Sequence, residues 1–266
     1  MNIIERNLTL GAVGYNACTQ DELIGYIQNY PVDRACYVSF LGAPHISIAE
    51  RSPAAKEAYQ NATIVAVDGM PVVKVAKKLD IVCERCGGPD IMERILKEGV
   101  EKGYTHYFYG ESPEVLVKLE ARCRERFPGI QIAGSFAPPY RPLTEEEEAT
   151  VLAELREKKP DFIWVSLGSP KQDEWMEKHA SLLVGSKLMG VGAAFKFLAG
   201  TVKRAPVCWR KAGLEWLYRI FKEPHLLWER YLKFSFGFLR ARKKAVKEYR
   251  ARQEEPEAAE EPVTLQ

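Results

Sequence analysis

Residues 162–180 read FIWVSLGSPKQDEWMEKHA, and this stretch decides the fold class. An apolar run, Phe162–Leu167, is followed by a glycine-containing turn, Gly168–Gln172, and by a polar stretch with helical spacing, Lys171–Ala180. A short apolar run of this kind is typical of a strand buried on both faces of a parallel sheet. The stretch therefore predicts a strand–loop–helix unit, the repeating element of α/β folds.

The same alternation recurs through the first two thirds of the chain. Further strands are expected at Ala35–Phe40, Thr63–Val67, His106–Tyr109, Ile130–Ala133 and Leu188–Val191. Further helices are expected at Ala54–Gln60, Pro89–Lys102, Pro113–Phe127 and Glu145–Lys158, with capping hydroxyls from Ser112 and Thr144 at two of their starts. This order predicts an open, Rossmann-like α/β domain: a mainly parallel sheet with helices on both faces.

Composition sets the broad class of protein. The chain has 266 residues, 46% of them hydrophobic and 11% aromatic, which favours a packed globular protein. No apolar run is long enough to span a bilayer, and the first residues do not resemble a signal peptide, so a cytoplasmic protein is expected. The lone pair Cys83 and Cys86 lacks the second pair of a zinc site, and no metal site is predicted.

Four glycine-containing loops mark the expected ligand site. They lie at Asp68–Pro71, Gly110–Ser112, Gly168–Gln172 and Gly190–Gly192, each at the end of an expected strand. Ligands of open α/β sheets bind beyond the carboxyl ends of the strands, where following helices present free N–H groups to phosphate. Four such loops favour a nucleotide diphosphate site, although each alone could be an ordinary turn. No Walker A motif, dinucleotide fingerprint or Asp-x-Asp element is present.

Residues 201–252 differ sharply in composition. They contain fifteen lysines and arginines against four glutamates, with Trp, Tyr, Phe and Leu at helical spacings. A basic, aromatic helix is typical of a segment lying on an anionic membrane surface. Packing on the core, nucleic-acid binding and binding of substrate phosphates are the alternatives, and no nucleic-acid module accompanies the segment. We divide the chain into an α/β core (1–200), a basic appendage (201–252) and a disordered acidic tail (253–266).

Several motifs in fixed order carry a family resemblance. They are VDGMPVV from Val67, ERCGGPD from Glu84, GSPKQDEW from Gly168, GVGAAF from Gly190, RAP from Arg204, GLEWLYR from Gly213 and the pair Glu223-Pro224. This set, spread over roughly residues 8 to 240, resembles the WecG/TagA/CpsF family of glycosyltransferases.

The resemblance implies an inverting, metal-independent glycosyltransferase that uses a UDP-sugar donor. The implied acceptor is a sugar on an undecaprenyl pyrophosphate carrier, in teichoic acid or other surface polysaccharide synthesis. It also implies a basic appendage that associates with the inner face of the cell membrane and completes the active site. Self-association into a homo-oligomer is also expected, because an apolar appendage without its lipid can self-associate.

The resemblance also assigns roles to individual residues. It implies that Asp68 is the catalytic base and that Arg219 of the appendage reaches into the active site to stabilise the leaving diphosphate. The expected substrate-binding residues are Ser39, Gly110, Gly168, Lys171, Gln172, Gly190, Gly192 and Arg204. A turn at Asp68-Gly69, a solvated Arg219 and an ordinary first-turn Gln172 are the competing structural interpretations.

The chain departs from the family pattern at three places. A threonine and a nearby asparagine usually end an early strand, whereas Ser39-Phe40-Leu41 stands here. Lys196 occupies a position that is acidic in many members, and His225-Leu226 stands where an arginine is usual. The departures leave the donor sugar open: N-acetylmannosamine or a related hexose. A nucleotide-binding oxidoreductase and a catalytically silent membrane adaptor remain the alternative functions.

Overall fold

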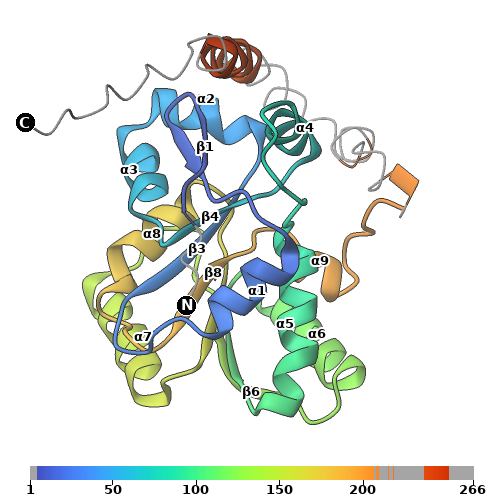
Figure 1. The fold of residues 1–266 in the computed structure, drawn as a ribbon. Coiled ribbons are helices and arrows are strands. Elements are labelled where there is room, and N and C mark those ends of the chain that lie inside the picture. Colours follow the sequence, from blue (N-terminus) through green and yellow to red (C-terminus); the bar gives the residue numbers. More distant parts are fainter. Residues whose placement is uncertain (1–4, 207, 210–214, 216–217, 219–236, 252–266) are drawn as a thin grey trace, which may run out of the picture.

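A six-stranded parallel sheet forms the centre of the molecule (Figure 1). The computed structural model describes residues 5–206, 208–209, 215, 218 and 237–251. Within them the sheet has the strand order β4-β3-β8-β7-β5-β6, and every neighbouring pair is parallel. The strands are β3 (Cys36–Leu41), β4 (Ile64–Val67), β5 (Thr105–Gly110), β6 (Gln131–Phe136), β7 (Phe162–Ser166) and β8 (Lys187–Gly190). A separate antiparallel hairpin pairs β1 (Leu8–Leu10) with β2 (Val13–Tyr15).

Helices cover both faces of this sheet. In β3, Tyr37 and Leu41 point into one apolar core, and Val38 and Phe40 point into the other. The first core is closed by α2 (Ala43–Arg51), α3 (Pro53–Asn61), α4 (Met70–Lys78), α7 (Glu145–Lys158) and α8 (Lys171–Ala180). The second is closed by α1 (Gln20–Gln28), α5 (Gly88–Lys102), α6 (Pro113–Arg126) and α9 (Ala194–Leu198). The expected Rossmann-like α/β class is confirmed.

The expected elements are all present, and the structure adds several. All six expected strands occur, with ends displaced by no more than three residues. Thr144 caps α7 as expected, through a reciprocal pair of hydrogen bonds with Glu147. Ser112 occupies the N-cap position of α6, but its hydroxyl makes no capping bond to the backbone, so that detail of the expectation was wrong. The hairpin and the helices α1, α2, α4 and α9 were not predicted.

A further helix, residues 237–251, packs at the same end of the sheet as α2 and α4 (Figure 1). Its Phe238 and Ala241 are buried in the first core, and Tyr249 donates a hydrogen bond to Asp80 at 2.8 Å. This helix and residues 201–206, 208–209, 215 and 218 are the described parts of the expected basic appendage. No helix within the described residues is both long and apolar enough to cross a bilayer.

Candidate active site

A cleft of about 830 Å³ opens along the carboxyl ends of the strands. Asp68 follows β4 and Glu111 follows β5. Four residues after β7 and four at the end of β8 also line the cleft: Gly168, Ser169, Lys171, Gln172, and Gly190–Ala193. Its volume suits a small-molecule ligand. The loops that the sequence nominated therefore meet along one edge of the sheet.

Asp68 is the carboxylate at the β4 end of this cleft. Its side chain is half-buried, and its N–H donates to the Leu41 carbonyl at 3.0 Å, which extends the pairing of β3 with β4. The pKa of Asp68 is raised to about 6, chiefly by burial; Glu215 and Asp90 also raise it, while Arg85 and Arg204 lower it. A carboxyl with this pKa is ionised at neutral pH and is a better proton acceptor than an exposed aspartate.

A cluster of charged side chains lies beside Asp68. Arg85 contacts Asp90 at 2.6 Å and Glu215 at 2.7 Å. Arg204 binds both carboxylate oxygens of Asp90 at 2.7 Å and contacts Glu215 at 3.3 Å. All four lie in motifs that carry the family resemblance, but only Arg204 was assigned a role from the sequence, as a substrate-binding residue. Arg204 is not among the described cleft-lining residues, and its guanidinium is committed to two carboxylates instead.

The loop between β7 and α8 rests on a buried carboxylate. Asp173 is fully buried and accepts hydrogen bonds of 2.6 Å from Ser39 and from Ser169. Ser169 also shares a 3.0 Å hydrogen bond with the hydroxyl of Tyr59. Burial raises the pKa of Asp173 to about 6, although the two serine donors favour its ionised form. Ser39, expected to touch substrate, is fully buried and contacts the loop only through Asp173 among the hydrogen bonds described above. Its neighbour Phe40 lines the cleft.

Gln172 joins two neighbouring loops. Its Nε2 donates to the Gly190 carbonyl at 2.7 Å, and its Oε1 accepts from the Gly192 N–H at 3.1 Å. The side chain lines the cleft but is only 3% exposed. Gln172 therefore fixes the turn after β8, and both ends of its amide are already used within the protein.

The loop glycines differ in what they do. Gly168 has a φ of +76°, and a Cβ atom there would have no neighbour within 4 Å, so it gives the cleft an open, left-handed turn. A Cβ on Gly190 would lie 2.6 Å from the Met176 methyl, so this glycine is required by close packing. Gly110 is buried against the Ser166 carbonyl and is not among the described lining residues.

Glu111 and Lys196 form an ion pair at the other end of the cleft. The Lys196 Nζ lies 3.2 Å from Glu111, which also accepts a hydrogen bond from Ser166 at 3.2 Å. Four strand spacings separate the end of β4 from the end of β5, or roughly 19 Å. Lys196, which departs from the family pattern, thus has Glu111 as its counter-ion, and both line the same cleft.

Aromatic and basic side chains complete the cleft wall. Trp175 stacks on Tyr109 with ring centroids 4.3 Å apart, and both line the cleft together with the exposed Tyr140. Lys171, expected to bind substrate, is exposed at the first residue of α8 and also lines the cleft. Arg219, the expected catalytic arginine, lies outside the described residues.

The described cysteines do not form a reactive or metal-binding pair. Cys83 and Cys86 are free and buried, and burial raises the pKa of the Cys83 thiol to about 12. Within the described ranges no group of three or more His, Cys, Asp and Glu side chains is arranged to hold a metal ion.

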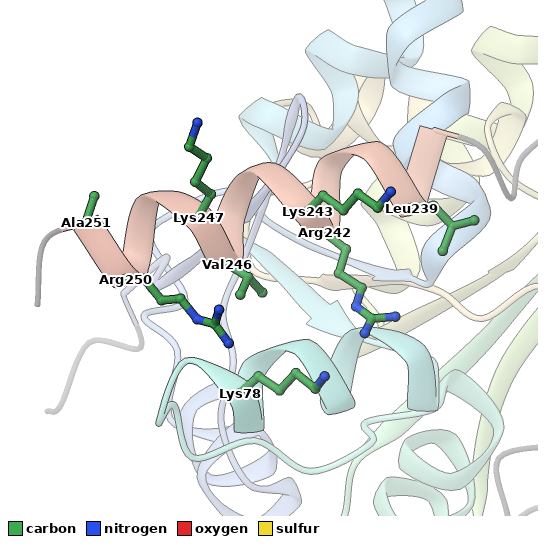
Figure 2. Close-up of a pocket in the computed structure, with 8 residues that line it drawn as sticks. All are labelled: Lys78, Leu239, Arg242, Lys243, Val246, Lys247, Arg250 and Ala251. Atoms are coloured by element: carbon green, nitrogen blue, oxygen red, sulfur yellow. The ribbon is translucent and has the colours of Figure 1, made fainter.

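A second cavity, the basic groove, lies between α4 and helix 237–251 (Figure 2). It has a volume of about 540 Å³ and is lined by Lys78, Leu239, Arg242, Lys243, Val246, Lys247, Arg250 and Ala251. Figure 2 shows Arg242 and Arg250 reaching from the helix towards α4, where Lys78 stands. Five of the eight lining side chains are cationic and none is acidic, so the groove attracts anions.

The chain is similar to known proteins of one family. The model of the family described as "Glycosyl transferase WecG/TagA/CpsF family" matches residues 8–251. Proteins from several Staphylococcus aureus strains, strain COL among them, are 33% identical over 164 residues. Those proteins are named N-acetylglucosaminyldiphosphoundecaprenol N-acetyl-beta-D-mannosaminyltransferase. The match covers 61% of this chain and 63% of each relative.

Proposed function

Since this chain belongs to the WecG/TagA/CpsF family of glycosyl transferases, we propose that it moves a sugar from a UDP-sugar to an undecaprenyl-diphosphate-linked sugar. The donated sugar is N-acetylmannosamine or a related hexose, as the name of the Staphylococcus aureus relatives suggests. The observation that carries the proposal is a half-buried carboxylate with a raised pKa, Asp68, at one end of a cleft built from the carboxyl ends of parallel strands.

The proposed reaction is a single displacement at the anomeric carbon. The acceptor hydroxyl gives its proton to the Asp68 carboxylate while its oxygen forms the new bond to the anomeric carbon. The bond from that carbon to the β-phosphate oxygen breaks, and UDP leaves with the electron pair. Attack from the face opposite the leaving group inverts the anomeric configuration, and one base is enough for this step.

The departing diphosphate gathers negative charge as its bond to the sugar breaks. Lys171 stands at the first residue of α8, and a helix N-terminus stabilises an anion through its free N–H groups and dipole. The open turn at Gly168 lets a phosphate approach this backbone. We therefore assign the diphosphate to the loops after β7 and β8, and keep Arg219 as a proposed contributor from the appendage.

The acceptor lipid gives the basic groove a role. Undecaprenyl carriers are embedded in phospholipid membranes, whose surfaces are commonly anionic. Each lysine or arginine near such a surface contributes about 1 kcal/mol of attraction. The five cations that line the groove would hold helix 237–251 and α4 against the membrane. We propose a peripheral enzyme of the inner membrane face, whose cleft receives the acceptor sugar from the lipid.

The first experiment measures UDP release from a panel of UDP-sugars. The acceptor is a GlcNAc-diphospholipid analogue, and the buffer contains no divalent metal. We expect release from one sugar that depends on acceptor and is lost, by about 10²- to 10⁴-fold, in Asp68→Asn. Asp33→Asn is the matched control, because Asp33 is exposed and precedes β3 at the opposite edge of the sheet.

The pH dependence of kcat/KM tests the role of Asp68 directly. Because the carboxylate must be ionised to accept a proton, the rate should rise with pH, level off above a midpoint near pH 6, and follow the ionisation of Asp68. Asp68→Asn should keep its affinity for UDP, since a base acts in the transition state. A variant that loses UDP affinity in proportion to turnover would assign Asp68 to donor binding instead.

The other two functions predict different outcomes. A nucleotide-binding oxidoreductase would change the fluorescence of NAD(P)H on binding and would not release UDP. A silent adaptor would bind membranes, release no UDP from any sugar, and support the same cellular function with Asp68→Asn as with the natural residue.

A further inference from the structure

The chain beyond α9 reaches back to the catalytic end of the sheet at two described positions. Arg204 and Glu215 both lie in the wall beside Asp68, more than 100 residues after Arg85 and Asp90 in the sequence. The four side chains are 17–24% exposed, so their charges are screened only partly by water.

These four side chains form a closed ring of ion pairs. Each guanidinium contacts both carboxylates: Arg85 at 2.6 and 2.7 Å, and Arg204 at 2.7 and 3.3 Å. Removing one member of such a ring leaves each of its two neighbours with a single ion-pair partner in a half-buried place. Glu215 and Arg204 are the two members that tie the segment after α9 to the core.

Gly87 shows how near the ring is to Asp68. A Cβ atom at Gly87 would lie 3.2 Å from Asp68 Oδ1, 3.1 Å from Asp90 Oδ2 and 3.4 Å from Arg85 Cζ. Asp68 and two members of the ring therefore approach the same point of the backbone closely, and a side chain at Gly87 would crowd all three.

We propose that Glu215 is a positioning residue of the active site, which binds Arg85 and Arg204 and offsets their positive charges beside Asp68. The inference rests on the proposed function for its meaning, but the contacts that carry it do not depend on the sugar transferred. Glu215 itself touches no reacting atom in this arrangement.

The charges around Asp68 give the sign of the effect. Arg85 from the loop before α5 and Arg204 from the segment after α9 favour its ionised form; Asp90 from α5 and Glu215 oppose it. His45 of α2 lines the same cleft. Neutralising Glu215 leaves two guanidiniums balanced by Asp90 alone, so the pKa of Asp68 should fall and the carboxylate should become a weaker base.

A purely structural tie would behave differently. If Glu215 only anchored the late segment, its loss would lower stability and the rate at every pH by the same factor. The midpoint of Asp68 titration would then stay where it is. The two roles are therefore separated by a titration and not by activity alone.

The test follows the Asp68 carboxyl carbon by ¹³C NMR of the full chain labelled at aspartate, with the signal assigned by its absence in Asp68→Asn. Glu215→Gln should move the midpoint to lower pH by at least about half a unit. Glu215→Asp, which keeps the charge, should restore most of that shift. Glu98→Gln is the matched control, because Glu98 pairs with Arg94 on α5 away from the cleft.

Each outcome decides the inference. An unmoved midpoint in folded Glu215→Gln overturns it, whatever happens to the melting temperature. If Glu215→Gln does not fold, Arg204→Gln replaces it, and loss of that cation should move the midpoint to higher pH. If the unaltered protein transfers no sugar, the proposed function fails, while the titration still tests the ring. Where transfer is measured, the acid limb of kcat/KM should shift with the NMR midpoint.

Discussion

Ser39→Ala should destabilise the protein by an amount that grows with pH. Ser39 is fully buried and donates a 2.6 Å hydrogen bond to Asp173, which is fully buried as well. A hydrogen bond to a charged group contributes about 1.5–3 kcal/mol, and one between neutral groups about 0.5–1.5 kcal/mol. The cost of losing the serine hydroxyl therefore depends on whether Asp173 carries its charge.

The ionisation of Asp173 sets the pH window. Its folded pKa of about 6 lies above the ordinary value of about 3.9 for an unfolded aspartate. Below pH 4 the carboxyl is protonated in both states. Between pH 4 and 6 the folded protein binds the extra proton, so the free energy of unfolding falls as pH rises, and above pH 6 both states are ionised. Removing the Ser39 donor raises the folded pKa further, so more stability is lost on the alkaline side.

Thermal unfolding at pH 5 and pH 8 measures the difference. For a chain of this size 1 kcal/mol corresponds to about 2–4 °C. We expect Ser39→Ala to lower the melting temperature by about 2–4 °C at pH 5 and by about 4–8 °C at pH 8. The control is Ser186→Ala, because Ser186 is buried and donates at the same 2.6 Å to a neutral carbonyl of Pro160. Equal losses for Ser39→Ala at both pH values would refute the reasoning.

Two further variants test the cleft and the groove. Gly190→Ala should cost about 1–3 kcal/mol of stability and weaken UDP binding, because its Cβ would lie 2.6 Å from the Met176 methyl in a packed loop. Calorimetry measures the stability and titration measures the UDP affinity. Unchanged values of the two would mean that the loop has room for the added methyl group. Arg242→Glu should reduce flotation with anionic liposomes at physiological salt more than Lys244→Glu, which changes the net charge by the same amount at an exposed position outside the groove lining. Equal losses would assign binding to net charge and not to the groove.

The sheet was predictable from the sequence because its strands are buried on both faces. β7 and β3 are short continuous apolar runs ended by glycine or by a polar turn, and that pattern strongly favours strands of a parallel sheet. Helix α4 was not predictable in the same way. It begins Met70-Pro71-Val72-Val73. Proline suits a first helical turn, but the β-branched valines are weak helix formers, and packing on the first core overrides their preference.

The candidate site was predictable as a set of loops but not as a set of contacts. The sequence nominated Asp68 and the loops at Gly168 and Gly190, because strand ends can be read from local pattern. The ring of Arg85, Asp90, Arg204 and Glu215 could not be found that way, since its members come from three separate segments and only the fold brings them together. The roles that the resemblance assigned to Asp68, Arg204 and the other expected site residues stay predictions.

Helix α4 also works as a spacer. It starts two residues after Asp68 and ends at Lys78 in the basic groove, so nine residues, or roughly 13 Å, separate the two. Because the middle of α4 is packed in the first core through Val72, Val73 and Val75, whatever binds in the groove is held at a constant distance from the carboxylate. A substrate anchored at one end of α4 therefore presents to Asp68 only those atoms that lie one helix length away.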